Sequence, residues 1–288
     1  MSRVAAAAVA VLALVLAGVG IAAWMGTSSA GETTPPPATT GPAPPPRPLR
    51  IIFPEGFSRA EMAERVAAVR EIAIERRGVT PRLTRAAYLA ATRAALPPRA
   101  FRAAWRRGTI EGFLFPATYE FTRLTTGRRL VADQLAAFRE QWAKVDLRYA
   151  RSKNLTPYDV LIIASMVEKE TAVASERPLV AAVIYNRLRN RMPLGIDATI
   201  RYGLGIPGTE SLTKQALATD SPYNTRLRTG LPPTPIANPG LASMRAAARP
   251  ARVPYLYYVR KPGSLAHFFT ASEREFLRKV CEYGYACD

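Results

Sequence analysis

Hydrophobic and polar residues follow one another along this chain with the periods expected of short helices and a few strands. Apolar residues recur at the spacing of amphipathic helices in segments 59–77, 84–96, 131–145, 157–170, 179–191 and 240–251. Runs rich in β-branched and aromatic residues predict strands at 49–53, 255–259 and 267–270, the last two as a hairpin, and 197–203 is expected to be extended. Loops rich in Pro, Gly and Asn separate these elements. The pattern predicts an α+β fold.

The segment 157–170 is an apolar helix that carries two glutamates near its C-terminal end. Thr156, followed three residues later by Asp159, resembles a capping box, and Pro157 suits the first helical position. At about 100° per residue, Glu168 lies on a polar arc of the helix and Glu170 on the apolar side. We therefore expect Glu168 to be solvated and Glu170 to face inward.

Glu170 is the first candidate for catalysis. Burial of a carboxylate among apolar groups penalises its charged form and raises its pKa, which would make Glu170 a competent general acid near neutral pH. The alternative is a glutamate at a fraying helix end whose carboxylate stays in water. The helical pattern alone leaves both interpretations open, because perturbed groups mark functional sites only as a tendency.

An almost unbroken apolar run from Val4 to Met25 is long enough to cross a bilayer as a helix. Only Arg3 precedes it as a charged residue, and the positive-inside bias puts the short N-terminus in the cytoplasm and the remainder outside. A cleaved signal peptide is the alternative, since small residues at 27–30 suit a cleavage site. The length of the run favours a retained anchor, and the Pro/Thr-rich residues 31–48 predict a semi-rigid spacer.

Composition narrows the choice of partner. The 288 residues are 48% hydrophobic, enough for a real core in one large domain or two small ones. Lys and Arg number 40 against 22 Asp and Glu, and the formal net charge of +18 indicates an anionic partner. Export and the lack of a nucleic-acid-binding motif argue against nucleic acid. An anionic cell-wall polymer or lipid head groups fit better, and a composition bias without a single patch is the alternative.

The cysteines and the histidine bear on the remaining chemistry. Cys281 and Cys287 lie close together at the C-terminus, where export to an oxidising compartment makes a short-loop disulfide reasonable. His267 is the single histidine of the sequence, which argues against a zinc site.

Six segments resemble, in the same order, the membrane-bound endolytic murein transglycosylases, the MltG or YceG-like family. They are EGFLFPATY (111–119), ASMVEKETAVASER (164–177), NRLRNRMPLGIDATIRYGLG (186–205), SPYNT (221–225), GLPPTPIANPG (230–240) and YLYYVRKPGSLAHFFT (255–270). Two segments depart from the family pattern. Where the family has FPDTY, this chain has Phe115-Pro-Ala-Thr-Tyr119. Where the family has Gln-Thr-Asp-Pro-Thr, this chain has Gly195-Ile-Asp-Ala-Thr199. The loss of that Asp from the first motif and of the Gln from the second removes possible hydrogen bonds to substrate or within the protein.

The resemblance implies cleavage of nascent peptidoglycan strands between N-acetylmuramic acid and N-acetylglucosamine, within the strand, leaving a 1,6-anhydro-muramyl end. The family's catalytic residue is the second glutamate of the EKET motif, Glu170 here, which agrees with the helical-face argument. No cofactor or metal is implied. The alternatives are a non-catalytic glycan-binding or division scaffold, with Glu170 ion-paired to Arg177 or Arg187, and a muramidase-type hydrolase with a second carboxylate beside Glu170.

Polar residues of the matching segments are candidates for holding the N-acetyl groups and stabilising the developing positive charge: Asn186, Thr199, Tyr202, Tyr223 and Asn224. Glu111 and Tyr119, from an aromatic-rich loop that suits sugar faces, and Asp197 complete the predicted substrate-binding set. An enzyme is expected to present Glu170 in a groove together with the loops 221–225 and 230–240.

The expected organisation is a cytoplasmic tip and membrane anchor (1–30), a linker (31–48), a truncated LysM-like module (49–107) and a catalytic domain (108–288) with a lysozyme-like helical part around Glu170. The family usually carries a fuller LysM-like region, so glycan binding by this module is in question. The resemblance and the anchor predict a single-pass protein of the inner (cytoplasmic) membrane with an extracytoplasmic catalytic domain. Expected partners are peptidoglycan glycan strands, the membrane, and peptidoglycan synthases or division proteins.

Overall fold

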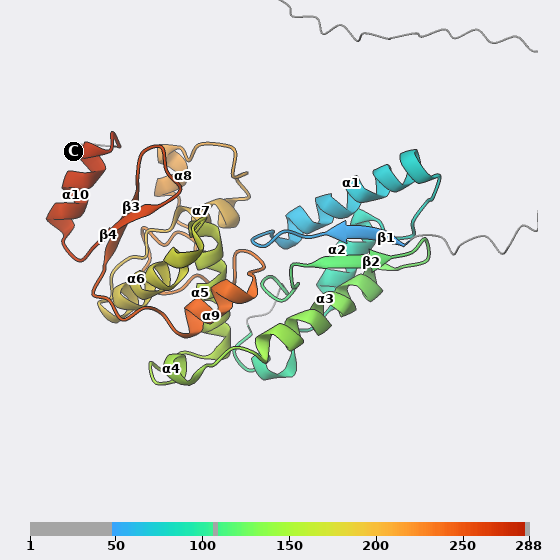
Figure 1. The fold of residues 1–288 in the computed structure, drawn as a ribbon, viewed down its shortest axis with the longest axis horizontal. Helices are drawn as coiled ribbons and strands as arrows, with labels where there is room; N and C mark the ends of the chain where they lie inside the picture. Colours follow the sequence, from blue (N-terminus) through green and yellow to red (C-terminus); the bar gives the residue numbers. More distant parts are fainter. Residues whose placement is uncertain (1–47, 106–108, 286–288) are drawn as a thin grey trace, which may run out of the picture. The chain divides into compact units, whose positions relative to one another are not determined.

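A two-stranded antiparallel sheet and three helices make up the first part of the computed structural model, which describes residues 48–105 and 109–285 (Figure 1). The sheet pairs β1 (Leu49–Ile52) with β2 (Thr118–Phe121), and the helices are α1 (Arg59–Arg77), α2 (Arg85–Ala94) and α3 (Gly127–Trp142), with a short 3-10 turn at Arg99–Phe101. Local sequence sets these boundaries. Ser58 and Glu61 form a reciprocal capping box at the start of α1, and Gly78 ends it with a left-handed φ of 60°.

The second part is mainly helical and closes with a hairpin. Its elements are α4 (Arg148–Arg151), α5 (Pro157–Glu170), a 3-10 turn (Ala174–Glu176), α6 (Arg177–Arg189), α7 (Asp197–Leu204), α8 (Lys214–Ala218), α9 (Leu241–Ala248), β3 (Tyr257–Arg260), β4 (His267–Thr270) and α10 (Glu273–Glu282). Figure 1 shows α5 lying between α6 and α9, with the β3–β4 hairpin beside α10. The predicted α+β class is confirmed, and the predicted closing hairpin is present.

Helix α5 is the centre of the buried core. Nine of its residues, Tyr158 and the eight from Val160 to Val167, are buried, and they cover the whole circumference of the helix. A helix that is apolar on all sides must be covered on all sides, and α6, α7 and α9 pack against it. One continuous hydrophobic cluster extends from Ile51 on β1 to Ala248 at the end of α9. This packing fixes the direction in which the C-terminal end of α5 points.

The loop 230–240 joins the two parts through a buried asparagine. Asn238 donates through Nδ2 to the carbonyl of Phe57 (2.9 Å) and to Glu111 Oε1 (2.7 Å), and its Oδ1 accepts from the backbone N–H of Leu114 (2.9 Å). Two residues later, the backbone of Gly240 lies so close to the Glu55 carboxylate that a Cβ atom would overlap it. The loop therefore approaches the first part more closely than a side chain at position 240 would allow.

Residues 197–203, which the sequence predicts to be extended, belong to helix α7. Ile196 and Ile200 are four residues apart, so they fall on one face of that helix, and this face is buried where α7 packs against α5. Strand β1 takes its partner from residues 118–121, beyond the predicted module boundary at 107, so residues 49–107 do not complete a sheet of their own. Cys281 is disulfide-bonded, and its predicted partner Cys287 lies outside the described residues.

The predicted membrane anchor also lies outside the described residues, as does the linker up to residue 47. Among residues 48–105 and 109–285, none of the helices combines the length and the apolar character that a bilayer crossing requires.

Candidate functional site

The C-terminal end of α5 presents Glu170 at the edge of the core. The helix begins at a reciprocal capping box between Thr156 and Asp159 with Pro157 at its first turn, as the sequence predicts. It ends because Thr171 turns to extended geometry (φ −117°, ψ 119°) and donates its hydroxyl back to the carbonyl of Val167 (2.7 Å). Glu170 is the last helical residue, so the rigid, buried helix body holds its backbone while its side chain leaves the helix.

The carboxyl group of Glu170 is partly buried and accepts a hydrogen bond at Oε2 from the hydroxyl of Tyr258 (2.8 Å). Burial raises the pKa of Glu170 above its ordinary value, and the nearby negative charge of Asp197 raises it further; Tyr258, His267 and Arg226 oppose the shift. The expectation that Glu170 faces inward agrees with this placement. The group retains its proton to higher pH than an ordinary glutamate, which is the property that a general acid needs.

The β3–β4 hairpin faces the C-terminal end of α5, where Tyr258 reaches Glu170. Its register pairs Tyr258 with Phe269 and Arg260 with His267, so these four side chains share one face of the hairpin. On that face the rings of Tyr258, His267 and Phe269 are in mutual contact, with centroids 5.4–6.1 Å apart. An aromatic surface thus lies next to the candidate acid.

Glu176 fixes the orientation of His267. One carboxylate oxygen of Glu176 accepts from the backbone N–H of His267 (2.8 Å), and the other lies 2.7 Å from His267 Nδ1. Both side chains are about one-tenth exposed. Because Nδ1 lies against a carboxylate, the ring cannot rotate without breaking this contact. The hairpin is therefore tied to the 3-10 turn that follows α5.

Glu168 does not behave as expected. Its side chain is only 6% exposed: Oε1 lies 3.7 Å from Arg177 Nη2, and Oε2 accepts from the backbone N–H of Gly240 (2.9 Å). The prediction of a solvated Glu168 is wrong, because the loop 230–240 covers the arc of α5 that helical periodicity assigned to solvent. Glu168 acts as a structural anchor for that loop.

Asp197 is the predicted substrate-binding residue whose charge reaches Glu170. It opens α7 and forms an ion pair with Arg226, with Oδ1 2.7 Å from the guanidinium and both side chains about half exposed. A second carboxylate is therefore present near Glu170, paired with an arginine rather than with the candidate acid.

Three other predicted substrate residues hold the protein together instead. Asn186 donates through Nδ2 to the carbonyls of Val253 and Tyr255, both at 2.9 Å, which anchors the entry to β3. Thr199 is fully buried and donates to the carbonyl of Ile196 (2.7 Å). Asn224 is also fully buried and bonds the carbonyls that close the turn after α8. These contacts do not support a direct role in substrate binding for the three residues.

Glu111 and the predicted tyrosines form a different group. Glu111 is 2% exposed and accepts from the Arg59 backbone N–H (2.8 Å), from Asn238 (2.7 Å) and from the Tyr202 hydroxyl (3.2 Å). Tyr223 bonds Thr234 through its hydroxyl (2.8 Å), and its ring contacts that of Tyr202. Glu111 is thus a buried junction between α1, α7 and the loop 230–240, which does not support substrate contact.

Tyr119 belongs to the sheet of the first part. It pairs with Ile51 across β1 and β2, and its hydroxyl donates to the carbonyl of Phe115 (2.7 Å). The substrate role predicted for Tyr119 has no support in these contacts, because its hydroxyl is engaged by its own loop.

Sequence reasoning missed Tyr258, His267, Arg226 and Glu176 as members of the site. The alternation of aromatic residues in YLYYV and HFF could have placed Tyr258 and His267 on one hairpin face, but nothing local brings that face to Glu170. Arg177 and Arg187, the ion-pair partners expected in a scaffold, have other partners: Arg177 faces Glu168, and Arg187 bonds the carbonyls of Leu194 and Leu256. Within the described ranges, Glu170 forms no ion pair.

Two pockets, of about 470 and 480 Å³, are lined by residues other than Glu170, and the groove predicted at Glu170 stays a prediction. The loop 230–240 reaches α5 through Glu168 and through Ser165, whose Oγ accepts from the Ile236 N–H (3.0 Å), rather than through Glu170. Among the described residues there is no group of three His, Cys, Asp or Glu side chains placed to hold a metal ion.

Comparison with known proteins gives consistent matches. The sequence pattern of the YceG-like family matches residues 39–282. A protein of Bacillus subtilis (strain 168) named endolytic murein transglycosylase is 36% identical over 152 residues, which cover 53% of this chain and 42% of that protein. A protein of the same name from Streptococcus pneumoniae (strain ATCC BAA-255 / R6) is 35% identical over 183 residues, 62% of this chain and 33% of that protein.

A crystal structure of a yceG-like protein from Listeria monocytogenes superposes with a TM-score of 0.67 and 28% sequence identity, covering 81% of this chain and 76% of that one. The chain spans less than half the length of the two named relatives that it matches.

Proposed function

This chain belongs to the YceG-like family, and from that premise we propose that it is an endolytic peptidoglycan lytic transglycosylase. It cleaves the bond between N-acetylmuramic acid and N-acetylglucosamine within glycan strands and leaves 1,6-anhydro-muramyl ends. The observation that carries the proposal is the carboxyl group of Glu170, which is held at the end of a buried helix, has a raised pKa and accepts a hydrogen bond from the Tyr258 hydroxyl.

One carboxyl group suffices for this reaction. Glu170 first donates its proton to the glycosidic oxygen as the bond from that oxygen to the muramyl C1 breaks. The resulting carboxylate then takes the proton of the muramyl C6 hydroxyl as that oxygen closes onto C1. Glu170 ends protonated, as it began, and water is not consumed. The hydroxyl of Tyr258 stabilises the carboxylate that exists between the two steps.

A hydrolase needs a second carboxylate to activate water or to act as nucleophile. Asp197 is the carboxylate to consider, because its negative charge contributes to the raised pKa of Glu170. Its ion pair with Arg226 makes it a weaker base. The products separate the two reactions, since hydrolysis leaves a reducing muramyl end and the transglycosylase reaction leaves an anhydro end.

Incubation of the chain with uncrosslinked glycan strands, followed by mass spectrometry of the fragments, tests this function. We expect internal fragments with anhydro-muramyl ends, each lighter by one water than the corresponding reducing-end fragment. Reducing-end fragments would assign a hydrolase, and intact strands would favour a glycan-binding scaffold.

Substitution of Tyr258 by Phe removes the hydroxyl that orients the Glu170 carboxyl. We expect kcat to fall by about tenfold or more, while the high-pH limb of the pH–rate profile moves to higher pH, because the lost hydrogen bond had favoured the carboxylate. Tyr257→Phe is the matched control: its ring lies on the other face of β3, stacked on Phe276. Equal loss in both variants would mean that the hairpin, and not the hydroxyl, supports activity.

The whole-protein setting is part of the same proposal. Residues 1–30 form a cytoplasmic tip and a single membrane anchor, 31–48 a spacer, 49–107 a truncated LysM-like module, and 108–288 an extracytoplasmic catalytic domain with a lysozyme-like helical part. The apolar run from Val4 to Met25 supports the anchor and the location in the cytoplasmic membrane. Peptidoglycan synthases and division proteins are the proposed protein partners.

A further inference from the structure

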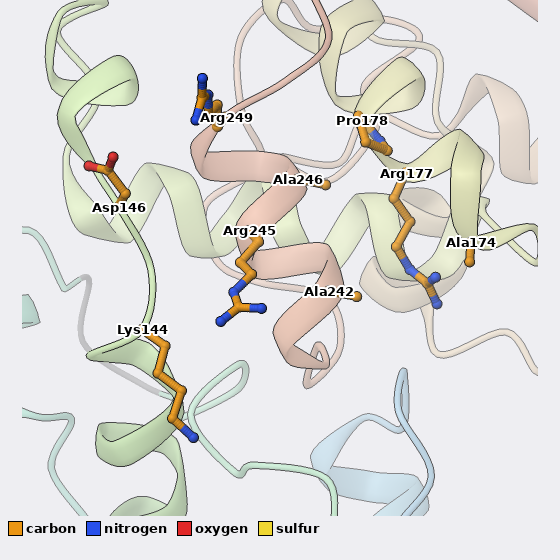
Figure 2. Close-up of a pocket in the computed structure, with 9 residues that line it drawn as sticks. All are labelled: Lys144, Asp146, Ala174, Arg177, Pro178, Ala242, Arg245, Ala246 and Arg249. Carbon is orange, nitrogen blue, oxygen red and sulfur yellow. The ribbon is translucent and has the colours of Figure 1, made fainter.

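Cationic side chains surround a pocket of about 470 Å³ that no catalytic step above uses. Arg245 and Arg249 belong to α9 and its C-terminal cap, Arg177 opens α6, and Lys144 follows α3. Figure 2 shows Arg245 between Lys144 on one side and Arg177 on the other, with Arg249 one turn further along α9. One acidic residue, Asp146, also lines the pocket.

The protein pairs part of this charge, because Lys144 lies beside Glu140 and Arg177 beside Glu168. Asp146 is already bound by Arg148, whose Nε and Nη2 lie 2.9 and 2.7 Å from its carboxylate. Arg245 and Arg249 are both exposed, and neither guanidinium has a hydrogen bond or an ion pair within the described residues. Like charges four residues apart repel each other on a helix face. An anion between them would remove this repulsion and satisfy both guanidinium groups.

The other two cations are held in place. Arg177 donates through Nε to Ser243 Oγ (3.1 Å) and lies 3.7 Å from Glu168, and its side chain is 15% exposed. Lys144 contacts Glu140 and Gln141 of α3 through Nζ, at 3.3 and 3.1 Å. A pre-positioned arginine on one wall and two unpaired arginines on α9 suit a ligand with more than one carboxylate, since guanidinium groups bind carboxylates through paired N–H donors.

The pocket lies within reach of the candidate acid. Ala174 lines it and is four residues after Glu170, so their Cα atoms are at most about 15 Å apart, at roughly 3.8 Å per residue. In murein, each muramyl residue carries a short peptide with free carboxylates, and three to five extended residues span roughly 10–17 Å. A peptide attached beside the bond at Glu170 could therefore reach the pocket.

We propose that this pocket binds the carboxylates of the stem peptide on the glycan strand that Glu170 cleaves. The inference rests on the function proposed above. A concave site lined from three segments fits a compact peptide terminus better than the plane of a bilayer, although lipid phosphates present a related anionic chemistry.

Binding is tested first without cleavage, by calorimetric titration of the full chain with a free murein stem tetrapeptide and with the same peptide amidated at its carboxylates. The test variant is Arg245→Ala/Arg249→Ala, and the matched control is Arg76→Ala/Arg93→Ala, which removes the same charge from exposed positions of α1 and α2. We expect the test variant to weaken binding of the free peptide by about tenfold or more and the control by about twofold or less. Amidation should weaken binding to the parent in the same way.

Cleavage gives the second readout. On strands that retain their peptides, the test variant should lower kcat/KM by about tenfold, and on strands stripped of peptides by an amidase it should match the parent. Peptide binding with no cleavage by the parent would refute the proposed function and support the pocket. Equal peptide affinity in parent and test variant would overturn the proposal, as would binding of inorganic phosphate or of vesicles containing anionic phospholipid in place of the peptide.

Discussion

Substitution of Glu170 by Gln is expected to abolish the release of anhydro-muramyl fragments, with a fall in kcat of about a thousandfold or more. The amide cannot donate a proton to the glycosidic oxygen, and it cannot accept one from the C6 hydroxyl. Its carbonyl oxygen can still accept from the Tyr258 hydroxyl, so the side chain keeps its place. The thermal unfolding temperature should be unchanged or slightly raised, because burial already favours a neutral group at this position.

The matched control is Glu168→Gln, two residues earlier on the same helix. The amide oxygen retains the contact with the Gly240 N–H, while the ion pair with Arg177 is lost. We expect this variant to lose stability and to keep cleavage within about tenfold of the parent, since removal of one partner of a buried pair acts mainly on the fold. Retention of most cleavage by Glu170→Gln would refute the assignment of the acid.

Removal of Glu111 should cause the largest change in stability. Burial raises the pKa of Glu111 to about 7 from an ordinary 4.5, against the opposing hydrogen bonds from Arg59, Tyr202 and Asn238. Below the ordinary value the group is protonated in both the folded and the unfolded chain and contributes nothing. Between pH 4.5 and about pH 7 the carboxyl group of Glu111 is protonated in the folded chain and ionised in the unfolded chain. The free energy of unfolding therefore falls by about 3 kcal/mol as pH rises through this window, and it does not fall further above pH 7 on account of this group.

Chemical denaturation near pH 5 and pH 8 measures this effect. Glu111→Gln keeps an acceptor for Arg59 and Asn238 and removes the titration, so it should be more stable than the parent near pH 8 and close to it near pH 5. Glu111→Ala leaves one buried and two partly buried donors without this acceptor and should cost roughly 2–4 kcal/mol near pH 5.

Glu120→Gln is the control for loss of a carboxylate, because Glu120 lies exposed on β2 in a surface pair with Arg50 and should change stability by less than about 1 kcal/mol. A parent and a Glu111→Gln variant with the same dependence on pH would show that Glu111 is solvated in the folded protein.

Local sequence determined the elements that carry the candidate acid. The capping box at Thr156, the proline after it and the apolar run to Val167 specify α5, because caps and periodicity depend on residues within one or two turns. The same periodicity placed Glu170 on the inward side. The hairpin and the α+β class followed from equally local patterns of aromatic and β-branched residues.

Only the tertiary structure decided what surrounds that acid. Tyr258 is 88 residues from Glu170 along the chain, and Gly240 is 72 from Glu168. No local pattern specifies which loop covers a given side of a helix. The burial of Glu168, and the internal hydrogen bonds of Glu111 and Asn224, therefore could not be predicted from the sequence. Polar residues in loops look alike in sequence whether they bind a ligand or a backbone carbonyl. The distinction depends on long-range packing, which determines whether a donor or acceptor is left facing solvent or is taken up by the protein.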